Sequence, residues 1–282
     1  MIRFITYSND LYAETRDFCG KMAKLRGKVD SVRLYKPEDI DEEFRRKYGH
    51  ILDIKAGNGL WLWKPYFVCR ELEEANDNDI VLYCDAGSFF FHDCRYIVNS
   101  MDDDIWVSNI PLIEKQFTKP ELFEAMNCEG EDYTETNQIQ GNFIAIRKTE
   151  RGLQFANEWL EICCSGENLF RETRFLVNAP SDFHFIGHRS DQSVLSLLAK
   201  KWKIKAHMDP SQYGRVPEKY YAPDRLFMKT GNQKELKVCI ILHRGRRPDL
   251  KTCINQWLCT WLPLWLLHSI STPCKQVKSL KI

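Results

Sequence analysis

Several patterns that would place a chain in a common class are missing here. The eleven cysteines are odd in number and form no Cys-x-x-Cys pair. A zinc site and a disulfide framework are therefore both poorly supported, and we expect reduced, mostly buried thiols. No Gly-x-Gly-x-x-Gly follows the first expected strand, which argues against a dinucleotide-dependent oxidoreductase. Internal repeats and low-complexity tracts are also absent.

Long hydrophobic runs and targeting segments are scarce as well. The longest apolar run, Trp257 to Leu267, is interrupted by Thr260 and Pro263. It is too short to span a bilayer as a helix. The first residues lead directly into a strand, without a signal peptide or transit sequence, so we expect a cytoplasmic protein.

Net charge is small, +1 over 282 residues, which argues against nucleic acid as a partner. The charge is unevenly placed, because residues 243–282 carry a surplus of +6 and the first 242 residues carry −5. We expect one domain over residues 1–250 and an apolar, basic appendage over 251–282. This appendage either packs on the domain or makes a peripheral contact with a membrane surface, and both alternatives stay open.

The order of expected elements is typical of an α/β fold. Strands are predicted at Ile2–Tyr7 and Val29–Tyr35, with a helix over Leu11–Leu25 between them and another opened by Pro37. Such a β-α-β-α start favours a mostly parallel sheet that binds nucleotides. The long polar stretch from Glu114 to Asp132 is interpreted as a loop that closes over or selects an acceptor.

The central strand runs from Ile80 to Cys84 and is followed by Asp85, Ala86 and Gly87. Ligands bind at the carboxyl ends of strands in open α/β sheets, so Asp85 is a candidate site residue. A helix cap or an Asx-turn is the alternative interpretation.

Three other stretches carry candidate residues. Lys64 lies in an aromatic cluster with Trp61 and Trp63, where a charged residue favours anion binding, while each tryptophan belongs either to the core or to the site. Asp191 and Gln192 begin a helix and either cap it or face a cleft. The last strand ends at His243, whose basic neighbours Arg244 and Arg246 indicate a metal and phosphate site or a solvated turn.

In this order, these motifs resemble GT-A glycosyltransferases of capsule and surface-glycan loci, and more distantly the glycogenin and lipopolysaccharide-galactosyltransferase group of retaining enzymes. The resemblance covers roughly residues 2 to 250. It is carried by Gly57-x-Gly59-x-Trp61-x-Trp63-Lys64-Pro65, Leu82-Tyr83-x-Asp85-Ala86-Gly87, Gln140-Gly141-Asn142, Asp191-Gln192-Ser193 and His243.

The resemblance implies a Rossmann-like GT-A fold and a hexosyltransferase that moves a sugar from a nucleotide-sugar, a UDP-sugar in particular, to a glycan or other acceptor. It implies retention of configuration and a divalent metal, Mn²⁺ or Mg²⁺. Asp85 and His243 would bind the metal, and a histidine ligand fits Mn²⁺ better. The donor would contact Thr6, Tyr7, Lys64, Asp85, Ala86, Gly87, Arg244 and Arg246.

Asp191 and Gln192 would act beside the anomeric carbon, where an oxocarbenium-like transition state gains from a nearby carboxylate or amide oxygen. Two departures from the pattern matter: Gly87 replaces a second metal-binding Asp, and Asn142 stands where a Gly is expected. A non-catalytic nucleotide-sugar or carbohydrate-binding relative is therefore the alternative. A nucleotidyltransferase would need more carboxylates beside Asp85 than the sequence offers.

Overall fold

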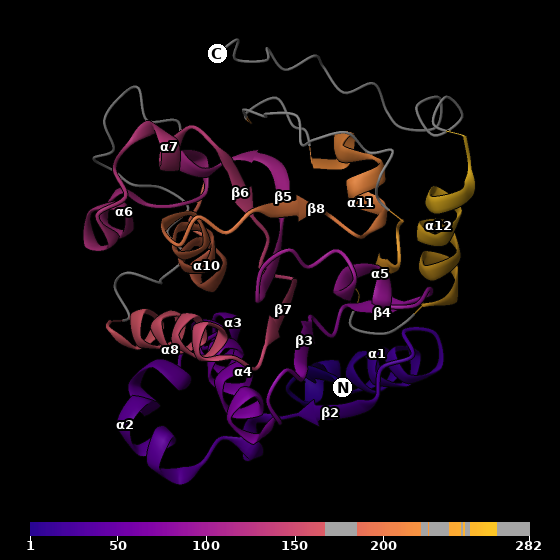
Figure 1. The fold of residues 1–282 in the computed structure, drawn as a ribbon, viewed down its shortest axis with the longest axis horizontal. Coiled ribbons are helices and arrows are strands. Elements are labelled where there is room, and N and C mark those ends of the chain that lie inside the picture. Colours follow the sequence, from indigo (N-terminus) through magenta and orange to yellow (C-terminus); the bar gives the residue numbers. More distant parts are fainter. Residues whose placement is uncertain (167–184, 221–224, 226–236, 244, 246–248, 264–282) are drawn as a thin grey trace.

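The computed structural model describes residues 1–166, 185–220, 225, 237–243, 245 and 249–263 (Figure 1). At its centre is a seven-stranded sheet of order β2-β1-β3-β7-β5-β6, with β8 paired to β5. The strands described are β1 (Ile2–Tyr7), β2 (Ser31–Tyr35), β3 (Ile80–Cys84), β5 (Ile105–Ile113), β6 (Asn137–Ile139), β7 (Phe143–Arg147) and β8 (Ala206–Met208).

Five of these seven described strands run in one direction, and β6 and β7 run in the other. The predicted α/β fold with a mostly parallel central sheet flanked by helices is confirmed. A second, two-stranded sheet pairs β4 (Ser88–Phe90) with β9 (Ile240–Leu242) in antiparallel fashion. It places the end of the last described strand beside the turn that follows β3.

Helices surround the sheet on both faces (Figure 1). Each described helix has the following bounds: α1 (Ala13–Leu25), α2 (Glu42–Leu52), α3 (Gly57–Leu60), α4 (Trp63–Glu74), α5 (Arg95–Val98), α6 (Pro120–Met126), α7 (Glu131–Thr134), α8 (Glu150–Cys164), α10 (Ser190–Lys201), α11 (Gln212–Arg215) and α12 (Leu250–Trp261).

Alternation along β3 builds the core on the two faces of the sheet. Val81 and Tyr83 pack in the larger apolar cluster with residues of α4, α8 and α10. Leu82 and Cys84 point the other way, into a cluster with α1 and β9. Successive side chains of a strand alternate between faces, so a strand buried on both sides reads as a continuous apolar run. This burial fixes Asp85 at the carboxyl edge of the sheet.

Two stretches differ from expectation. Gln138 to Arg147 was predicted as one strand, and the structure divides it into β6 and β7, which both pair with β5 in antiparallel fashion. Between the two strands the Gln140 N–H still donates to the Ser108 carbonyl of β5 at 2.9 Å, so a local irregularity of the pairing separates them. The expected acceptor loop is also different, because β5 continues to Ile113 and Glu114 is fully buried. A segment anchored by a buried carboxylate is not a free lid.

The helix α12 packs on β9 and α11, and Arg215 Nη2 donates to the Leu262 carbonyl at 2.9 Å. Trp257 and Trp261 remain 38% and 67% exposed.

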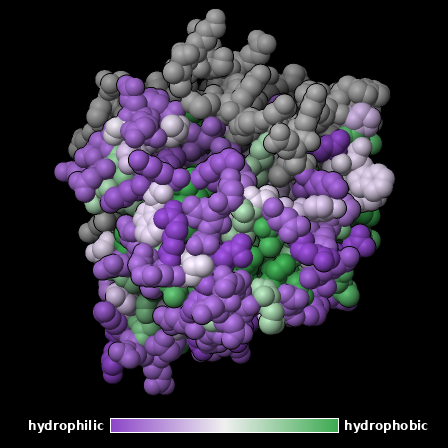
Figure 2. Space-filling view, in the orientation of Figure 1, coloured by the Kyte–Doolittle hydropathy of each residue, from purple (hydrophilic) through white to green (hydrophobic). Residues whose placement is uncertain are grey.

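Within the described residues, every helix is too short or too polar to cross a membrane. Figure 2 shows a largely hydrophilic face with hydrophobic groups between the polar ones.

Candidate functional site

Two acidic side chains meet one buried lysine at the carboxyl end of β3. Asp85 directly follows this strand, and Asp191 lies in the first turn of α10. Lys64, in the first turn of α4, places its Nζ 2.7 Å from Asp191 Oδ2 and 3.4 Å from Asp85 Oδ1. The ammonium also donates to the Gly141 carbonyl at 3.0 Å. Three residues selected from the sequence are therefore brought together.

Lys64 is only 3% exposed, and its three contacts match the three hydrogens of an ammonium group. Burial by itself lowers the pKa of Lys64, but the charges of Asp191 and Asp85 outweigh it and the pKa is raised. The lysine therefore stays charged. We predicted that it contacts a diphosphate; in the structure its ammonium faces protein acceptors and holds the two carboxylates in place.

Asp191 is the more buried of the two acids, with 5% of its surface exposed. Burial raises the pKa of Asp191 to about 6, against the opposing effect of Lys64 and with a further raising effect from Asp85. The carboxyl group is thus ionised at neutral pH but close to its titration range. A perturbed pKa with a specific charged partner is common at functional sites.

Asp85 is oriented by its neighbours and remains accessible. Its side chain is 35% exposed, and the Tyr83 hydroxyl donates to Oδ1. Its main-chain N–H donates to the Asn142 carbonyl at 3.0 Å. Within the described ranges, Oδ2 has no hydrogen-bond or ion-pair partner. One oxygen is thus held by protein, and the other is available to a ligand.

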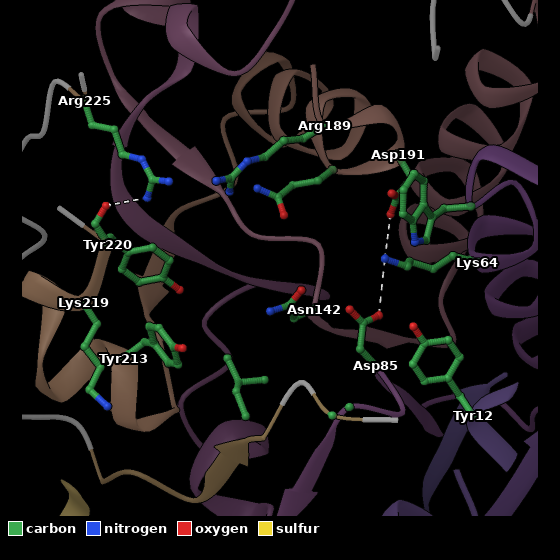
Figure 3. A pocket seen from close by; sticks show the side chains of 15 residues that line it. Tyr12, Lys64, Asp85, Asn142, Arg189, Asp191, Tyr213, Lys219, Tyr220 and Arg225 are labelled. Carbon is green, nitrogen blue, oxygen red and sulfur yellow. Dashed lines mark hydrogen bonds and ion pairs between the residues drawn. The ribbon is translucent and has the colours of Figure 1, made fainter. Parts of the chain in front are cut away.

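A cavity with a volume of about 600 Å³ opens beside these acids, a size typical of small-molecule sites. Figure 3 shows Lys64, Asp85, Asp191 and Tyr12 on one wall and Tyr213, Lys219, Tyr220 and Arg225 on the opposite wall, with Asn142 between them. The remaining lining residues are Trp61, Gly87, Arg189, Gln192, Leu242 and Gly245.

A left-handed turn over residues 57–61 places Trp61 on the cavity. The angle φ is positive at all five positions, from +51° at Leu60 to +96° at Gly59. This backbone costs about 1–2 kcal/mol for each residue other than glycine. A Cβ at Gly57 would lie 2.2 Å from the Trp61 ring, so glycine is required there. Trp63, by contrast, is buried and stacks on Tyr7. Trp61 therefore belongs to the site, and Trp63 belongs to the core.

Gln192 also lines the cavity, and both ends of its amide are held by protein. Oε1 accepts from the Gly141 N–H at 3.2 Å, and Nε2 donates to Gln138 Oε1 at 2.8 Å. Gln138 in turn donates to Glu114 Oε1 at 3.0 Å. A buried hydrogen-bond chain therefore fixes the orientation of Gln192, and the expected acceptor loop contributes its anchor, Glu114.

His243 lies next to the turn after β3, because the pairing of β4 with β9 lets its N–H donate to the Gly87 carbonyl at 3.0 Å. Burial lowers the pKa of His243, which keeps the ring neutral at neutral pH. Its Nδ1 accepts from the Gly245 N–H at 3.2 Å, and its buried Nε2 has no partner in the described part of the chain.

The residues predicted to contact the nucleotide-sugar donor differ in where the structure places them. Gly87 lines the cavity. Thr6, Tyr7 and Ala86 are buried and lie outside the lining, so their contact with a nucleotide stays a prediction. Arg244 and Arg246 fall outside the residues that the structure describes.

Several lining residues were not selected from the sequence, among them Tyr12, Arg189, Tyr213, Lys219 and Arg225. The last three come from a polar segment with several aromatics after β8, and that composition is the one signal they give in the sequence. Among the described residues, no group of three or more His, Cys, Asp or Glu is arranged to hold a metal ion. A metal here would need oxygen ligands from its substrate.

No protein-family model and no curated protein sequence matches the chain. Solved structures to which it is similar include glycosyltransferases. Mouse xyloside xylosyltransferase 1 has 10% identity and a TM-score of 0.47, covering 88% of this chain and 100% of its own. Galactosyltransferase LgtC, in complex with donor and acceptor sugar analogues, has 14% identity and a TM-score of 0.42, covering 97% and 98%. Glycosyltransferase GlyE of Streptococcus pneumoniae TIGR4 has 12% identity and a TM-score of 0.43, covering 98% and 65%.

Proposed function

We propose that the protein transfers a sugar from a nucleotide-sugar to an acceptor. The observation that carries this proposal is the pair of carboxylates, Asp85 and Asp191, held by the single buried Lys64 on the wall of a cavity at the carboxyl end of β3. Ligands bind at this edge of open α/β sheets. The nucleotide would lie on the side of β1 and β3, with the bond to be broken near Asp85 and Asp191.

Asp191 would act beside the anomeric carbon. Cleavage of the bond to the diphosphate leaves positive charge on the sugar ring, and a nearby carboxylate stabilises such a transition state. Lys64 keeps this carboxylate ionised and in a fixed position, at 2.7 Å. Gln192, whose amide is held by Gly141 and Gln138, would orient the sugar with its remaining N–H and lone pair.

A divalent ion would be held by Asp85 through Oδ2 and by His243 through Nε2. The residues fit this role, because Oδ2 is not paired within the described ranges and Nε2 is a buried atom that lacks a partner there. Binding would require the ring proton to move from Nε2 to Nδ1, and the hydrogen bond that Nδ1 accepts from the Gly245 N–H would then be lost. When bound, such an ion stabilises the negative charge of the leaving diphosphate. Substrate oxygens would complete its coordination, and Mn²⁺ suits the oxygen and imidazole ligands.

The test is a panel of nucleotide-sugars with Mn²⁺, followed by detection of transferred or hydrolysed sugar. Asp191→Asn should lower kcat at least ~100-fold, the range typical of lost electrostatic stabilisation. Asp17→Asn is the matched control, since Asp17 lies on α1 with a side chain that is 61% exposed. If no donor is bound, hydrolysed or transferred, the proposal is wrong.

A non-catalytic nucleotide-sugar or carbohydrate-binding protein is the second candidate. It is favoured by Gly87, which leaves Asp85 as the only acid of the turn after β3. In that case a nucleotide-sugar would bind, binding would survive Asp191→Asn, and no product would form with any donor.

A further inference from the structure

The left-handed turn over residues 57–61 holds three side chains in a strained backbone. The angle φ is positive at all five positions, and Asn58, Leu60 and Trp61 are the three residues there that are not glycine. Residues in such conformations cluster at ligand sites, where the surrounding structure compensates for the strain. What each of the three side chains contacts therefore shows what the strain achieves.

Contacts inside the protein account for Asn58 and Leu60. Asn58 Nδ2 donates to the Tyr7 hydroxyl, and Leu60 is 3% exposed and belongs to the larger apolar cluster. The Gly59 N–H donates to the Ile54 carbonyl at 2.7 Å, which ties the turn to the segment after α2. These two strained residues thus stabilise the fold.

Trp61 differs from them, because its ring is half-buried and lines the cavity. It directly follows α3 in the left-handed region, with φ of +61°, a position that glycine or asparagine usually occupies. A glycine would adopt this backbone without strain but would leave the cavity without a ring. The strain at Trp61 therefore serves the cavity and not the core.

One face of the Trp61 ring rests on Gly57. A Cβ at Gly57 would lie 2.2, 2.4 and 2.6 Å from three adjacent carbons of the six-membered ring, Cε3, Cδ2 and Cζ3. Distances this similar mean that the atom would stand above the plane of the ring and not beside its edge. Gly57 thus lets the indole lie flat on the main chain, and the opposite face of the ring is directed away from the turn.

Trp61 is also tied to the groups that react in the proposed mechanism. Its carbonyl accepts from the Lys64 N–H at 2.9 Å, so the ring and the lysine belong to one turn of the chain. Lys64 Nζ lies 2.7 Å from Asp191 Oδ2 (Figure 3), on the carboxylate placed beside the anomeric carbon. The part of the substrate nearest to this segment is the sugar that is transferred.

We infer that Trp61 is the binding platform for the transferred sugar, a pyranose whose ring stacks on the indole through one face of C–H groups. Stacking on a flat aromatic ring buries the apolar face of the sugar and leaves its hydroxyl groups free to form hydrogen bonds. This inference rests on the proposed function, since it assigns a contact of the donor in the same site.

The experiment is a calorimetric titration of the full chain in the presence of Mn²⁺. UDP-glucose, UDP-galactose and GDP-mannose are each compared with their own nucleoside diphosphate, UDP or GDP. Trp61→Ala should lower the affinity for the nucleotide-sugar that binds about 10-fold and leave the affinity for its nucleoside diphosphate unchanged. Trp61→Phe keeps a flat ring and should lose no more than ~3-fold.

Trp61→Leu is a further variant, which keeps apolar volume without a flat ring and should lose as much as Trp61→Ala. Trp261→Ala is the matched control and should change nothing, because Trp261 is 67% exposed on α12 and lies outside the lining of the cavity. Circular dichroism of each variant checks its fold.

Saturation-transfer NMR on the same nucleotide-sugar is the second measurement. Hydrogens on one face of the sugar ring should receive the strongest transfer from the unchanged protein. This preference for one face should disappear in Trp61→Ala and persist in Trp61→Phe.

Equal losses for the nucleotide-sugar and its nucleoside diphosphate in Trp61→Ala and Trp61→Leu overturn the inference, because the ring would then contact the nucleotide. Unchanged affinity for both ligands overturns it as well. If the unchanged protein binds no nucleotide-sugar, the proposed function fails, and free glucose, galactose and mannose decide the inference by saturation transfer. Binding of a free sugar that Trp61→Ala abolishes then keeps Trp61 as a sugar platform, and its absence overturns that role.

Discussion

Replacing Lys64 by methionine would leave two carboxylates at the site without their shared cation. Removing one partner of a buried ion pair typically lowers the free energy of unfolding by about 3–5 kcal/mol, because the other charge stays buried without compensation. Lys64 is 3% exposed and Asp191 is 5% exposed, so the full range applies here.

The loss should depend on pH in a definite direction. In the native protein the pKa of Asp191 is about 6, above its ordinary value of 3.8. The folded state therefore holds a proton that the unfolded state has released between these values, and stability falls as pH rises through this window, by about 3 kcal/mol. Without Lys64 the folded pKa rises further, so the loss continues above pH 6.

Urea denaturation followed by tryptophan fluorescence at pH 5 and pH 8 measures this difference. Lys64→Met should be destabilised more at pH 8 than at pH 5, and adding Asp191→Asn should recover part of the loss at pH 8. Lys205→Met serves as a control, because Lys205 is 74% exposed and pairs with Asp102 at the surface, a contact of about 0–1 kcal/mol. A loss that is the same at both pH values would refute the assignment of Asp191 as the charge that Lys64 compensates.

Three other predictions follow from the same structure. Glu114→Leu should lower the free energy of unfolding by about 3–5 kcal/mol, since four donors lose their buried acceptor. Urea denaturation measures this change, and an unchanged midpoint would contradict the buried network. Gly59→Ala should lower the free energy of unfolding by about 1–3 kcal/mol, because φ is +96° there and a Cβ would lie 2.8 Å from Leu52 Cα. Gly49→Ala is the contrasting variant, since Gly49 lies in α2 and a Cβ there would have nothing within 4 Å. It should raise the free energy of unfolding by about 0.5–1 kcal/mol. His243→Ala should weaken Mn²⁺ binding at least ~10-fold in calorimetric titrations with UDP present, and unaltered affinity would remove His243 from the metal site.

Much of the fold can be predicted from local pattern. The apolar run from Ile80 to Cys84 indicates a strand buried on both faces, and the structure places it in the middle of the sheet. The strand predicted over residues 138–147 is divided into β6 and β7, because nothing local shows the irregularity at residues 140–142. Polar composition alone likewise does not show that Glu114 accepts from four donors, and the contact of residues 114–132 with an acceptor stays a prediction.

The sequence by itself determined the candidate acids, the lysine in its aromatic cluster and the glycines of the left-handed turn, because each depends on side-chain chemistry or backbone freedom at one position. Only the tertiary structure decided that Lys64 holds Asp85 and Asp191 together and that Lys219 and Arg225 lie on the opposite wall of the cavity. These contacts join segments distant in the chain, so they follow from strand order and helix packing. The same physics explains why Lys64, predicted as an anion ligand, is turned toward the protein: a cation buried between two carboxylates is stabilised by both.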